Sequence, residues 1–485
     1  MNVQAIQGLF ADLFTGAAGA ATAPMIALGV GVLLLMVVDL FPAARPTRGL
    51  VFLGSLAVAC FYEVAILRTP PGSVLDGTLV ADAGTALWGM LFLLATALAW
   101  AYSVGYYRPE NAAFGAEHDM LMLATPVGMM LMVGAQDLLV FFIGLELLSI
   151  PLYALAAFRR SRAVSVEAGL KYFLLGAFAV GFFLYGAALL YSQTGSLSLA
   201  ALAAADKSST LALTGLALIT ASLFFKFSVF PFHLWVPDVY QGSPTPVTAL
   251  MATGTKAAAI GFLIQFAVLL PPEAATTVAV IALLTMAAGN LGALMQEDLK
   301  RMLAYSGVAH AGTLLLVVAG YLGGGLELGP VLAAALFYMG AYVFTTSGAF
   351  GLIALLEADG ERFTKLDSLR GLARSRPGVA AALALFLLSL AGIPATGGFL
   401  GKWLVFSVLV DAGMFGTAVI GVLLTLIAFG FYLRVLVVLY MQPAPDGERP
   451  PTTTRPLSAG IATLVCAAGV LAMGLLPGWF LNQLG

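Results

Sequence analysis

The fold is decided by residues 224–256, which read FFKFSVFPFHLWVPDVYQGSPTPVTALMATGTK. The stretch is apolar over most of its length, yet it holds Lys226, Lys256 and four prolines. Proline removes a backbone hydrogen-bond donor and clashes with the preceding turn, so a helix that contains these prolines must be interrupted. Inside a lipid bilayer, the freed backbone groups are tolerated only where protein or water satisfies them. The stretch therefore indicates a broken helix within a membrane protein.

The composition of the whole chain agrees with a membrane location. Of its 485 residues, 61% are hydrophobic and only 9% are charged, and the mean hydropathy is +1.00. Soluble domains carry about 25% charged residues, so the composition excludes a soluble enzyme. Apolar stretches of roughly 20 residues, which is the length that spans a bilayer, recur along the chain. They predict fourteen transmembrane helices, near residues 22–40, 49–67, 82–104, 117–134, 136–157, 166–191, 211–232, 243–269, 275–295, 301–320, 329–356, 379–408, 414–441 and 457–482.

The basic residues predict how these helices are oriented. Of the 22 basic residues, fifteen fall in loops after odd-numbered helices, whereas only Arg68 and Lys207 fall in loops after even-numbered ones. Because basic loops tend to stay in the cytoplasm, both termini are predicted to face the non-cytoplasmic side. The fifteen are Arg45, Arg48, Arg108, Arg159, Arg160, Arg162, Lys300, Arg301, Arg362, Lys365, Arg370, Arg374, Arg376, Arg449 and Arg455.

A few charged residues lie inside the predicted apolar spans, namely Glu146, Lys171, Lys226, Lys256, Lys402 and Arg434. A lysine near the bilayer centre costs about 2.5–3.5 kcal/mol on insertion scales. Arg434 and Lys171 are placed where a long side chain can reach the interface. Lys226, Lys256 and Lys402 have longer apolar flanks, and they are therefore predicted to be functional.

The chemistry of these residues suits proton movement. Burial disfavours the charged form of a lysine, and a neighbouring carboxylate favours it. A lysine whose carboxylate partner moves closer and then away can therefore bind and release a proton. Glu146, in FFIGLELLSIPLYAL (residues 141–155), is the predicted partner. The alternative is a static ion pair that holds two helices together, which in lipid is an expensive means of attachment.

His233 and His310 are further candidates, since imidazole titrates near physiological pH. For each of them, a neutral, hydrogen-bonded histidine in the protein interior is the alternative. The proton pathway predicted from the sequence consists of Glu146, Lys226, Lys256, Lys402, His233, His310 and Lys171.

The sequence predicts no cofactor, metal or nucleic-acid site in this chain. GGFLGKW (residues 397–403) superficially resembles a phosphate-binding loop, but Thr396 and Trp403 replace residues that the motif requires. Cys60 and Cys466 lack the spacing of a metal site or an iron–sulfur cluster. The net charge of −2, without a basic patch, speaks against nucleic-acid binding.

Taken together, several segments resemble subunit N of bacterial NADH-quinone oxidoreductase, one of the antiporter-like membrane subunits of respiratory complex I. The resemblance covers residues from about 115 to 445, and DVYQGSPTP (residues 238–246) indicates subunit N rather than its paralogues. The segments are the opening stretch, GLELLSIPLYAL (144–155), SVEAGLKYFLLGAF (165–178), QEDLKRMLAYSGVAHAG (296–312) and LSLAGIPATGGFLGKW (388–403).

The resemblance implies an all-α polytopic membrane protein in the bacterial inner membrane. Its centre would be two inverted five-helix repeats, at residues 117–269 and 275–441, with broken seventh and twelfth helices. Residues 1–116 would form three N-terminal helices, and residues 457–485 would form a C-terminal helix.

The resemblance also implies roles for the buried charges. Glu146 of the fifth helix would pair with Lys226 of the seventh, Lys256 would connect two half-channels, and Lys402 would be the twelfth-helix lysine. NADH, FMN, iron–sulfur clusters and quinone would be bound by partner subunits. The expected partners are the other membrane subunits of complex I and the lipid bilayer.

Three functions are consistent with these features. The leading hypothesis is a subunit that couples electron transfer from NADH to quinone to proton pumping through buried lysines and glutamate. A subunit of a multi-subunit cation/proton antiporter is the first alternative, and it would exchange cations for protons without NADH. A structural membrane scaffold is the second, and neutral substitutions of Lys226 and Lys256 would then change assembly but not pumping.

Overall fold

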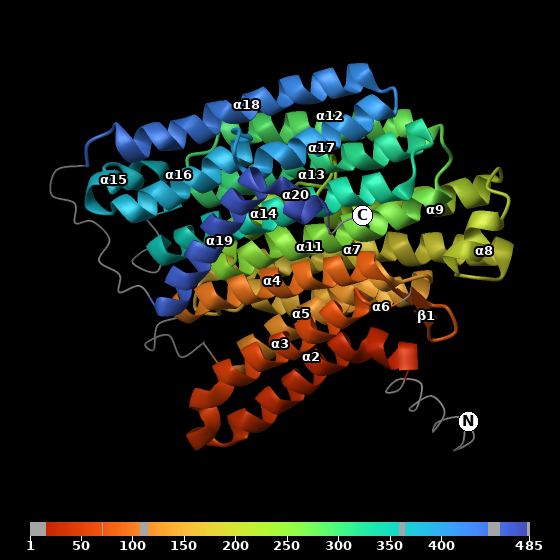
Figure 1. The fold of residues 1–485 in the computed structure, drawn as a ribbon, viewed down its shortest axis with the longest axis horizontal. Helices are drawn as coiled ribbons and strands as arrows, with labels where there is room; N and C mark the ends of the chain where they lie inside the picture. The colour runs from red at the N-terminus through yellow and green to blue at the C-terminus, as the bar shows by residue number, and fades with distance from the viewer. Residues whose placement is uncertain (1–15, 70, 107–114, 358–363, 445–455, 483–485) are drawn as a thin grey trace.

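The computed structural model describes residues 16–69, 71–106, 115–357, 364–444 and 456–482. In these residues the chain is almost entirely helical, and the long helices run roughly side by side (Figure 1). Twelve helices are long and apolar enough to span a membrane. Helix α5 and the broken pair α16–α17 add two further spans to these twelve, which gives fourteen. The prediction of a multi-pass, all-α membrane protein is confirmed.

The helices of the first part of the chain run from α2 and α3, at one edge of the stack, to α11 in its centre (Figure 1). They are α2 (Gly16–Leu40), η1 (Pro42–Thr47), α3 (Arg48–Ile66), α4 (Ala83–Tyr106), α5 (Ala116–Gly134), α6 (Leu138–Ala156), α7 (Ala163–Thr194), α8 (Leu199–Ala204), α9 (Thr210–Phe227), α10 (Trp235–Gly242), α11 (Thr245–Phe266) and η2 (Ala267–Leu269).

The second part of the chain continues the stack, with α18 at the edge opposite to α2 and α3 (Figure 1). Its helices are α12 (Ala274–Leu294), α13 (Leu299–Gly324), α14 (Leu328–Glu357), η4 (Leu366–Leu369), α15 (Leu372–Ser375), α16 (Pro377–Ala391), α17 (Gly397–Asp411), α18 (Phe415–Tyr440), α19 (Leu457–Leu475) and α20 (Pro477–Leu481).

Two features of the observed secondary structure were not predicted. Strands β1 (Gly72–Val74) and β2 (Leu79–Ala81) form an antiparallel hairpin between α3 and α4. The Asp-Gly pair at its turn, residues 76–77, is a hairpin signal that could have been recognised in the sequence. The predicted last span, 457–482, is divided at Pro477, because proline favours the first position of a new helix.

Both expected helix breaks are present, the one indicated by the prolines of residues 224–256 and the one that the resemblance implies in the twelfth helix. Helix α9 ends at Phe227, and Ser228 follows in a left-handed conformation with φ 67°. Helix α16 ends at Ala391, and Gly392 follows with φ 91°. The chain resumes as α10 after the first break and as α17 after the second.

Helix α11 is buried on all sides, and it packs against α4, α5 and α14. A helix that is apolar all round has no solvent-facing stripe, so burial in the centre of the protein is its stable position. Lys256 lies in the middle of this helix and is only 2% exposed. The centre of the fold therefore holds a lysine that neither lipid nor bulk water can reach directly.

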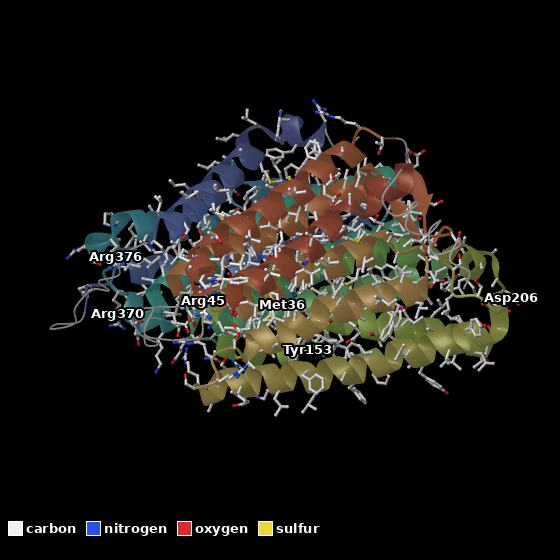
Figure 2. All side chains as sticks on the ribbon, turned by 90° about the horizontal axis from the view of Figure 1, so that it is seen from below. Met36, Arg45, Tyr153, Asp206, Arg370 and Arg376 are labelled. Carbon is white, nitrogen blue, oxygen red and sulfur yellow. The ribbon has the colours of Figure 1, made fainter. Side chains whose placement is uncertain are left out.

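The two ends of the helix stack differ in their exposed charges. Arg45, Arg370 and Arg376 lie at one end, whereas Asp206 lies at the other (Figure 2). This arrangement agrees with the alternation of basic loops in the sequence. Some of the basic residues used for that prediction lie outside the described residues, namely Arg108, Arg362, Arg449 and Arg455.

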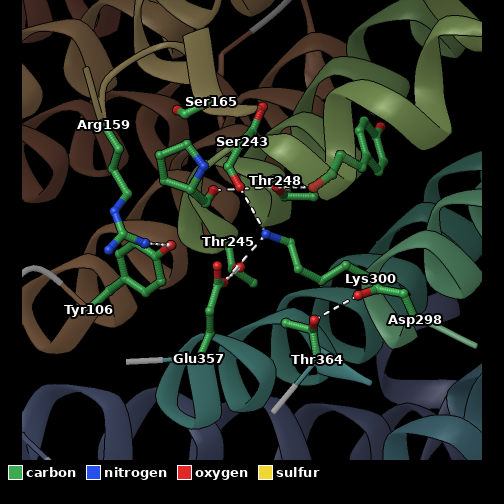
Figure 3. A network of polar contacts seen from close by, with 12 residues as sticks. Tyr106, Arg159, Ser165, Ser243, Thr245, Thr248, Asp298, Lys300, Glu357 and Thr364 are labelled. Atoms are coloured by element: carbon green, nitrogen blue, oxygen red, sulfur yellow. Dashed lines mark hydrogen bonds and ion pairs between the residues drawn. The ribbon is translucent and has the colours of Figure 1, made fainter. Parts of the chain in front are cut away.

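At the basic end, a buried ion cluster ties the two parts of the chain together (Figure 3). The Nζ of Lys300 lies 3.4 Å from Oε2 of Glu357 and donates to the carbonyl of Ser243 at 2.9 Å. The other carboxylate oxygen of Glu357 lies 3.3 Å from Nη1 of Arg162, and the Thr245 hydroxyl also donates to this carboxylate. The cluster joins the starts of α7, α11 and α13 to the end of α14.

The sequence assigned Lys300 to a loop, but the structure buries it. Its side chain is 2% exposed because α13 already begins at Leu299, and the side chain of Glu357 is 4% exposed. Removing one member of a buried ion pair leaves the other charge uncompensated. The stability of this end of the protein therefore depends on both partners.

Lys300→Met is expected to destabilise the protein, at most by about 3–5 kcal/mol, since it leaves the buried Glu357 carboxylate with Arg162 as its remaining cation. The double variant Lys300→Met/Glu357→Gln should recover much of this loss, because it removes both charges. Thermal unfolding in detergent measures the difference. Arg370→Met is the control, because Arg370 belongs to an exposed pair with Asp367 and should have little effect. A double variant less stable than the single one would contradict this account.

Helices α5 and α6 cross at glycines, with their backbones in close contact. A Cβ added to Gly144 would lie 2.7 Å from the backbone nitrogen of Met132 and 2.9 Å from the carbonyl oxygen of Gly128. This crossing fixes the position of α6, which carries Glu146 and Ser149.

Gly144→Leu is therefore expected to lower stability by about 1–3 kcal/mol, because the added side chain overpacks the crossing. Gly181→Leu on α7 is the matched control, since nothing lies within 4 Å of a Cβ at that position. Melting temperatures of the two variants in detergent test this. Equal effects of the two substitutions would show that the crossing is not as tight as described.

Candidate functional site

Lys226 lies in the last turn of α9 and is 4% exposed. Its ammonium group donates hydrogen bonds to the hydroxyls of Ser149, at 2.7 Å, and Tyr172, at 3.2 Å. The ring of Tyr172 is held by stacking on Trp235, with 4.7 Å between ring centroids. The buried lysine is thus surrounded by neutral hydroxyl groups on rigid helices.

Glu146 lies one turn before Ser149 on α6, in a half-buried position. It is close enough to Lys226 for the two charges to interact. Among the described residues, however, no direct ion pair joins them, and Ser149 occupies the contact with the ammonium group. The Ser149 hydroxyl accepts from the ammonium group of Lys226 and donates to the backbone carbonyl of Leu145, one turn earlier on α6.

Lys256 reaches from α11 toward the first helix break. Its Nζ donates to the carbonyl of Phe227 at 3.5 Å. In an uninterrupted helix this carbonyl would accept from the backbone N–H of residue 231, four positions later. Residue 231 is proline and has no N–H, so the carbonyl is free for the lysine.

Lys402 makes the same kind of contact at the second break. Its Nζ donates to the carbonyls of Leu390, at 2.8 Å, and Ala391, at 2.9 Å. The helical partner of Leu390 would be the N–H of residue 394, which is again a proline. The negative end of the α16 dipole further favours a cation at this position.

His310 on α13 lies between the two proline breaks. Its Nδ1 is 2.7 Å from the hydroxyl of Tyr338, and its Nε2 is 3.4 Å from that of Tyr432. A small cavity is lined by both His310 and Lys402. Gly307 lies one turn before His310 on α13, and a Cβ added to Gly307 would lie 3.6 Å from Cε of Lys256. His310 therefore lies within reach of the surroundings of both lysines.

The structure places the other two predicted residues differently. His233 lies within the first break, and it is buried with its Nδ1 lacking a hydrogen-bond partner among the described residues. Lys171 is half-exposed, and it pairs with Glu167 at 2.7 Å and with Asp238 at 2.8 Å. Asp238 also pairs with Arg301 at 2.7 Å. Lys171 thus belongs to a surface ion cluster rather than to the row of buried lysines.

Sequence reasoning missed the hydroxyl groups around the buried charges, namely Ser149, Tyr172, Tyr338 and Tyr432. Serine and tyrosine are common in helices, and nothing in their spacing indicates which of them meets a lysine. The sequence analysis also passed over His118, which is fully buried on α5 next to Asp119. No cluster of His, Cys, Asp and Glu able to hold a metal ion is found among the described residues.

Comparison with known proteins agrees with this arrangement. The family described as NADH:quinone oxidoreductase/Mrp antiporter, TM, matches residues 135–428. The NADH-quinone oxidoreductase subunit N of Salinibacter ruber is 41% identical over 468 residues, covering 94% of this chain and 92% of that protein. The subunit of the same name from Trichlorobacter lovleyi is 39% identical over 470 residues, covering 95% and 94%.

Solved structures share the fold. A chain of respiratory complex I from Thermus thermophilus, with bound aureothin, has a TM-score of 0.81 and 35% identity, covering 95% of this chain and 99% of that one. A chain of the Mrp complex from Dietzia sp. also has a TM-score of 0.81, but at 24% identity its likeness shows the fold alone. With relatives this similar along nearly its whole length, the chain belongs to the NADH-quinone oxidoreductase subunit N family, and the resemblance predicted from the sequence is confirmed.

Proposed function

We propose that this chain is a proton-translocating membrane subunit of an NADH-quinone oxidoreductase, in which buried lysines and a glutamate carry the protons. The observation that supports this most strongly is the row of three nearly unexposed lysines, Lys226, Lys256 and Lys402. None of them forms an ion pair among the described residues, so each can gain or lose its proton without breaking a salt bridge.

The contacts suggest an order for the relay. Glu146 would set the charge of Lys226 electrostatically, because a nearby carboxylate favours the ammonium form. Lys226 is followed directly by Phe227, whose carbonyl accepts from Lys256. From Lys256 the proton would pass the hydroxyl groups around His310 to Lys402. Water would complete the gaps between these groups.

Lys171 and His233 have secondary places in this proposal. Lys171 precedes Tyr172, which contacts Lys226, so its half-exposed cluster with Asp238 would be the outermost point of the route. His233 lies in the break that Lys256 faces, and its unpaired Nδ1 would accept a proton or a water.

The division of the chain follows from the two proline breaks. We place one five-helix bundle at residues 117–269 and a second, inverted one at 275–441, so that each holds one break. Residues 1–116 would be the N-terminal helices and residues 457–485 the C-terminal segment. Helix α11, with Lys256, lies where the two bundles meet.

The proposal also assigns surroundings to the chain. It would lie in the bacterial inner membrane with its basic end in the cytoplasm and both termini on the other side. Other complex I membrane subunits would be its neighbours, and further subunits would bind NADH, FMN, iron–sulfur clusters and quinone. Moving each proton against 100 mV costs about 2.3 kcal/mol, and the redox reaction in those subunits would supply that energy.

A subunit of a cation/proton antiporter is the second candidate, because the matching family also includes Mrp antiporters. Such a protein would exchange Na⁺ or K⁺ for H⁺ without NADH. A structural membrane scaffold is the third candidate, in which the buried lysines would only support assembly. Pumping measurements separate these functions.

Lys226→Ala is expected to abolish proton pumping per NADH oxidised in membrane vesicles while the complex stays assembled, because the relay loses its first buried base. Lys207→Ala is the matched control, since Lys207 is exposed and donates only to the carbonyl of Val268 at 3.4 Å. Unchanged pumping by an intact Lys226→Ala complex would overturn the relay and favour the scaffold. Cation-driven proton exchange without NADH would instead favour the antiporter.

A further inference from the structure

A buried acidic group that the proposed relay does not use lies on the N-terminal helices. Glu63 is in the last turn of α3, and it is only 4% exposed. In the part of the chain that the structure describes, its carboxyl group forms no ion pair and no hydrogen bond to protein. An ionised carboxylate buried without a partner is strongly unfavourable, so the group must be neutral or must have access to water.

Among the residues that the structure describes, no charged neighbour compensates Glu63. On its own helix, Cys60 lies one turn back, and the exposed Arg68 follows the helix end. Asp39 lies at the end of α2 that is farther from Glu63. The His118–Asp119 pair likewise lies at the end of α5 that is farther from Glu63. At the start of α4, Asp82 instead caps the backbone N–H of Thr85, at 2.8 Å. The hairpin β1–β2 adds only Asp76, in its exposed turn.

The packing around Glu63 leaves room for the carboxyl group. A Cβ added to Gly89 of α4 would lie 2.1 Å from Oε1 of Glu63, so only glycine accommodates the carboxyl there. A cavity of about 20 Å³ lies beside it, lined also by Val80, Thr85 and Gly134. That volume is enough for about one water molecule, which needs polar partners such as the carboxyl and the Thr85 hydroxyl.

The small cavity borders a larger one. A cavity of about 420 Å³ shares Val80 and Thr85 with it and is also lined by Asp82, Gln136 and Gln265. Gln265 is in the last turn of α11, the helix that holds Lys256. Thr85 lines both cavities, but its hydroxyl is already engaged, since it donates to the carbonyl of Asp82 at 2.9 Å and accepts from the N–H of Asp82 at 2.8 Å. A proton would therefore pass between Glu63 and the larger, polar space through water in the small cavity.

We propose that Glu63 is a proton-binding site that exchanges its proton with the larger cavity through water in the small cavity. In the closed packing described here the carboxyl group carries its proton. Water entering the small cavity allows it to ionise and release the proton toward Asp82 and Gln136. Glu63 lies at the end of the helix stack opposite to the basic end. The proposed topology places this end outside the cytoplasm. The site stands on its own geometry and does not require the lysine relay.

The test uses the intact complex in lipid vesicles and the apolar reagent dicyclohexylcarbodiimide, which modifies protonated carboxyl groups in apolar surroundings. Mass spectrometry locates the modified residues. Glu63 is expected to be modified near neutral pH, with a yield that falls as the pH rises. Asp206, which is fully exposed and ionised, serves as the internal control and should stay unmodified. An unmodified Glu63 across the pH range, in a complex whose Glu146 reacts, would overturn the proposal.

Infrared spectroscopy gives an independent readout that does not depend on reagent access. The carbonyl-stretch band of a protonated carboxylic acid should be present in the wild type and absent from Glu63→Gln, which keeps the shape of the side chain. A spectrum unchanged by Glu63→Gln would also overturn the proposal. Lys226→Ala should leave the band intact, which separates this test from that of the pumping mechanism.

Discussion

The structure depends on one constraint: every backbone carbonyl inside the membrane needs a hydrogen-bond donor. Pro231 and Pro394 each remove the donor that a carbonyl four residues earlier would use. In both places a buried lysine supplies it, Lys256 for Phe227 and Lys402 for Leu390. Each helix break and its lysine therefore depend on each other. Without the lysine the freed carbonyl would be buried without a donor, and without the break the buried ammonium group would lack an acceptor.

This arrangement has a consequence for function. A lysine bonded to carbonyls is stabilised as a cation but is not locked by a salt bridge, so a change in nearby charge can shift its protonation. The surrounding helices hold the geometry fixed: α11 is buried on all sides, α5 and α6 meet at Gly128 and Gly144, and the Lys300–Glu357 pair closes the basic end. In the proposed function, the charges that titrate are thus separate from the Lys300–Glu357 pair that holds helices together.

Much of this could be predicted from the sequence. The spans, the two breaks and the three buried lysines follow from hydropathy, proline and the cost of charge in lipid, which act locally along the chain. The contacts of Lys226 with Ser149 and Tyr172 could not be predicted, because they depend on how α6, α7 and α9 pack. Lys300 and Glu63 were missed for a related reason: both lie near helix ends, where sequence alone does not separate a buried side chain from a solvated one.

The pairing of Lys402 with a proline-freed carbonyl can be measured directly by solid-state NMR. The experiment measures the dipolar coupling between ¹⁵N at lysine Nζ and ¹³C at leucine carbonyls in the membrane-embedded complex, with Lys402→Met to assign the signal. The account predicts a short-range coupling that disappears in Lys402→Met and weakens in Pro394→Ala, where an N–H at position 394 competes for the Leu390 carbonyl. A coupling that is absent from the wild type, or unchanged in Pro394→Ala, would contradict it.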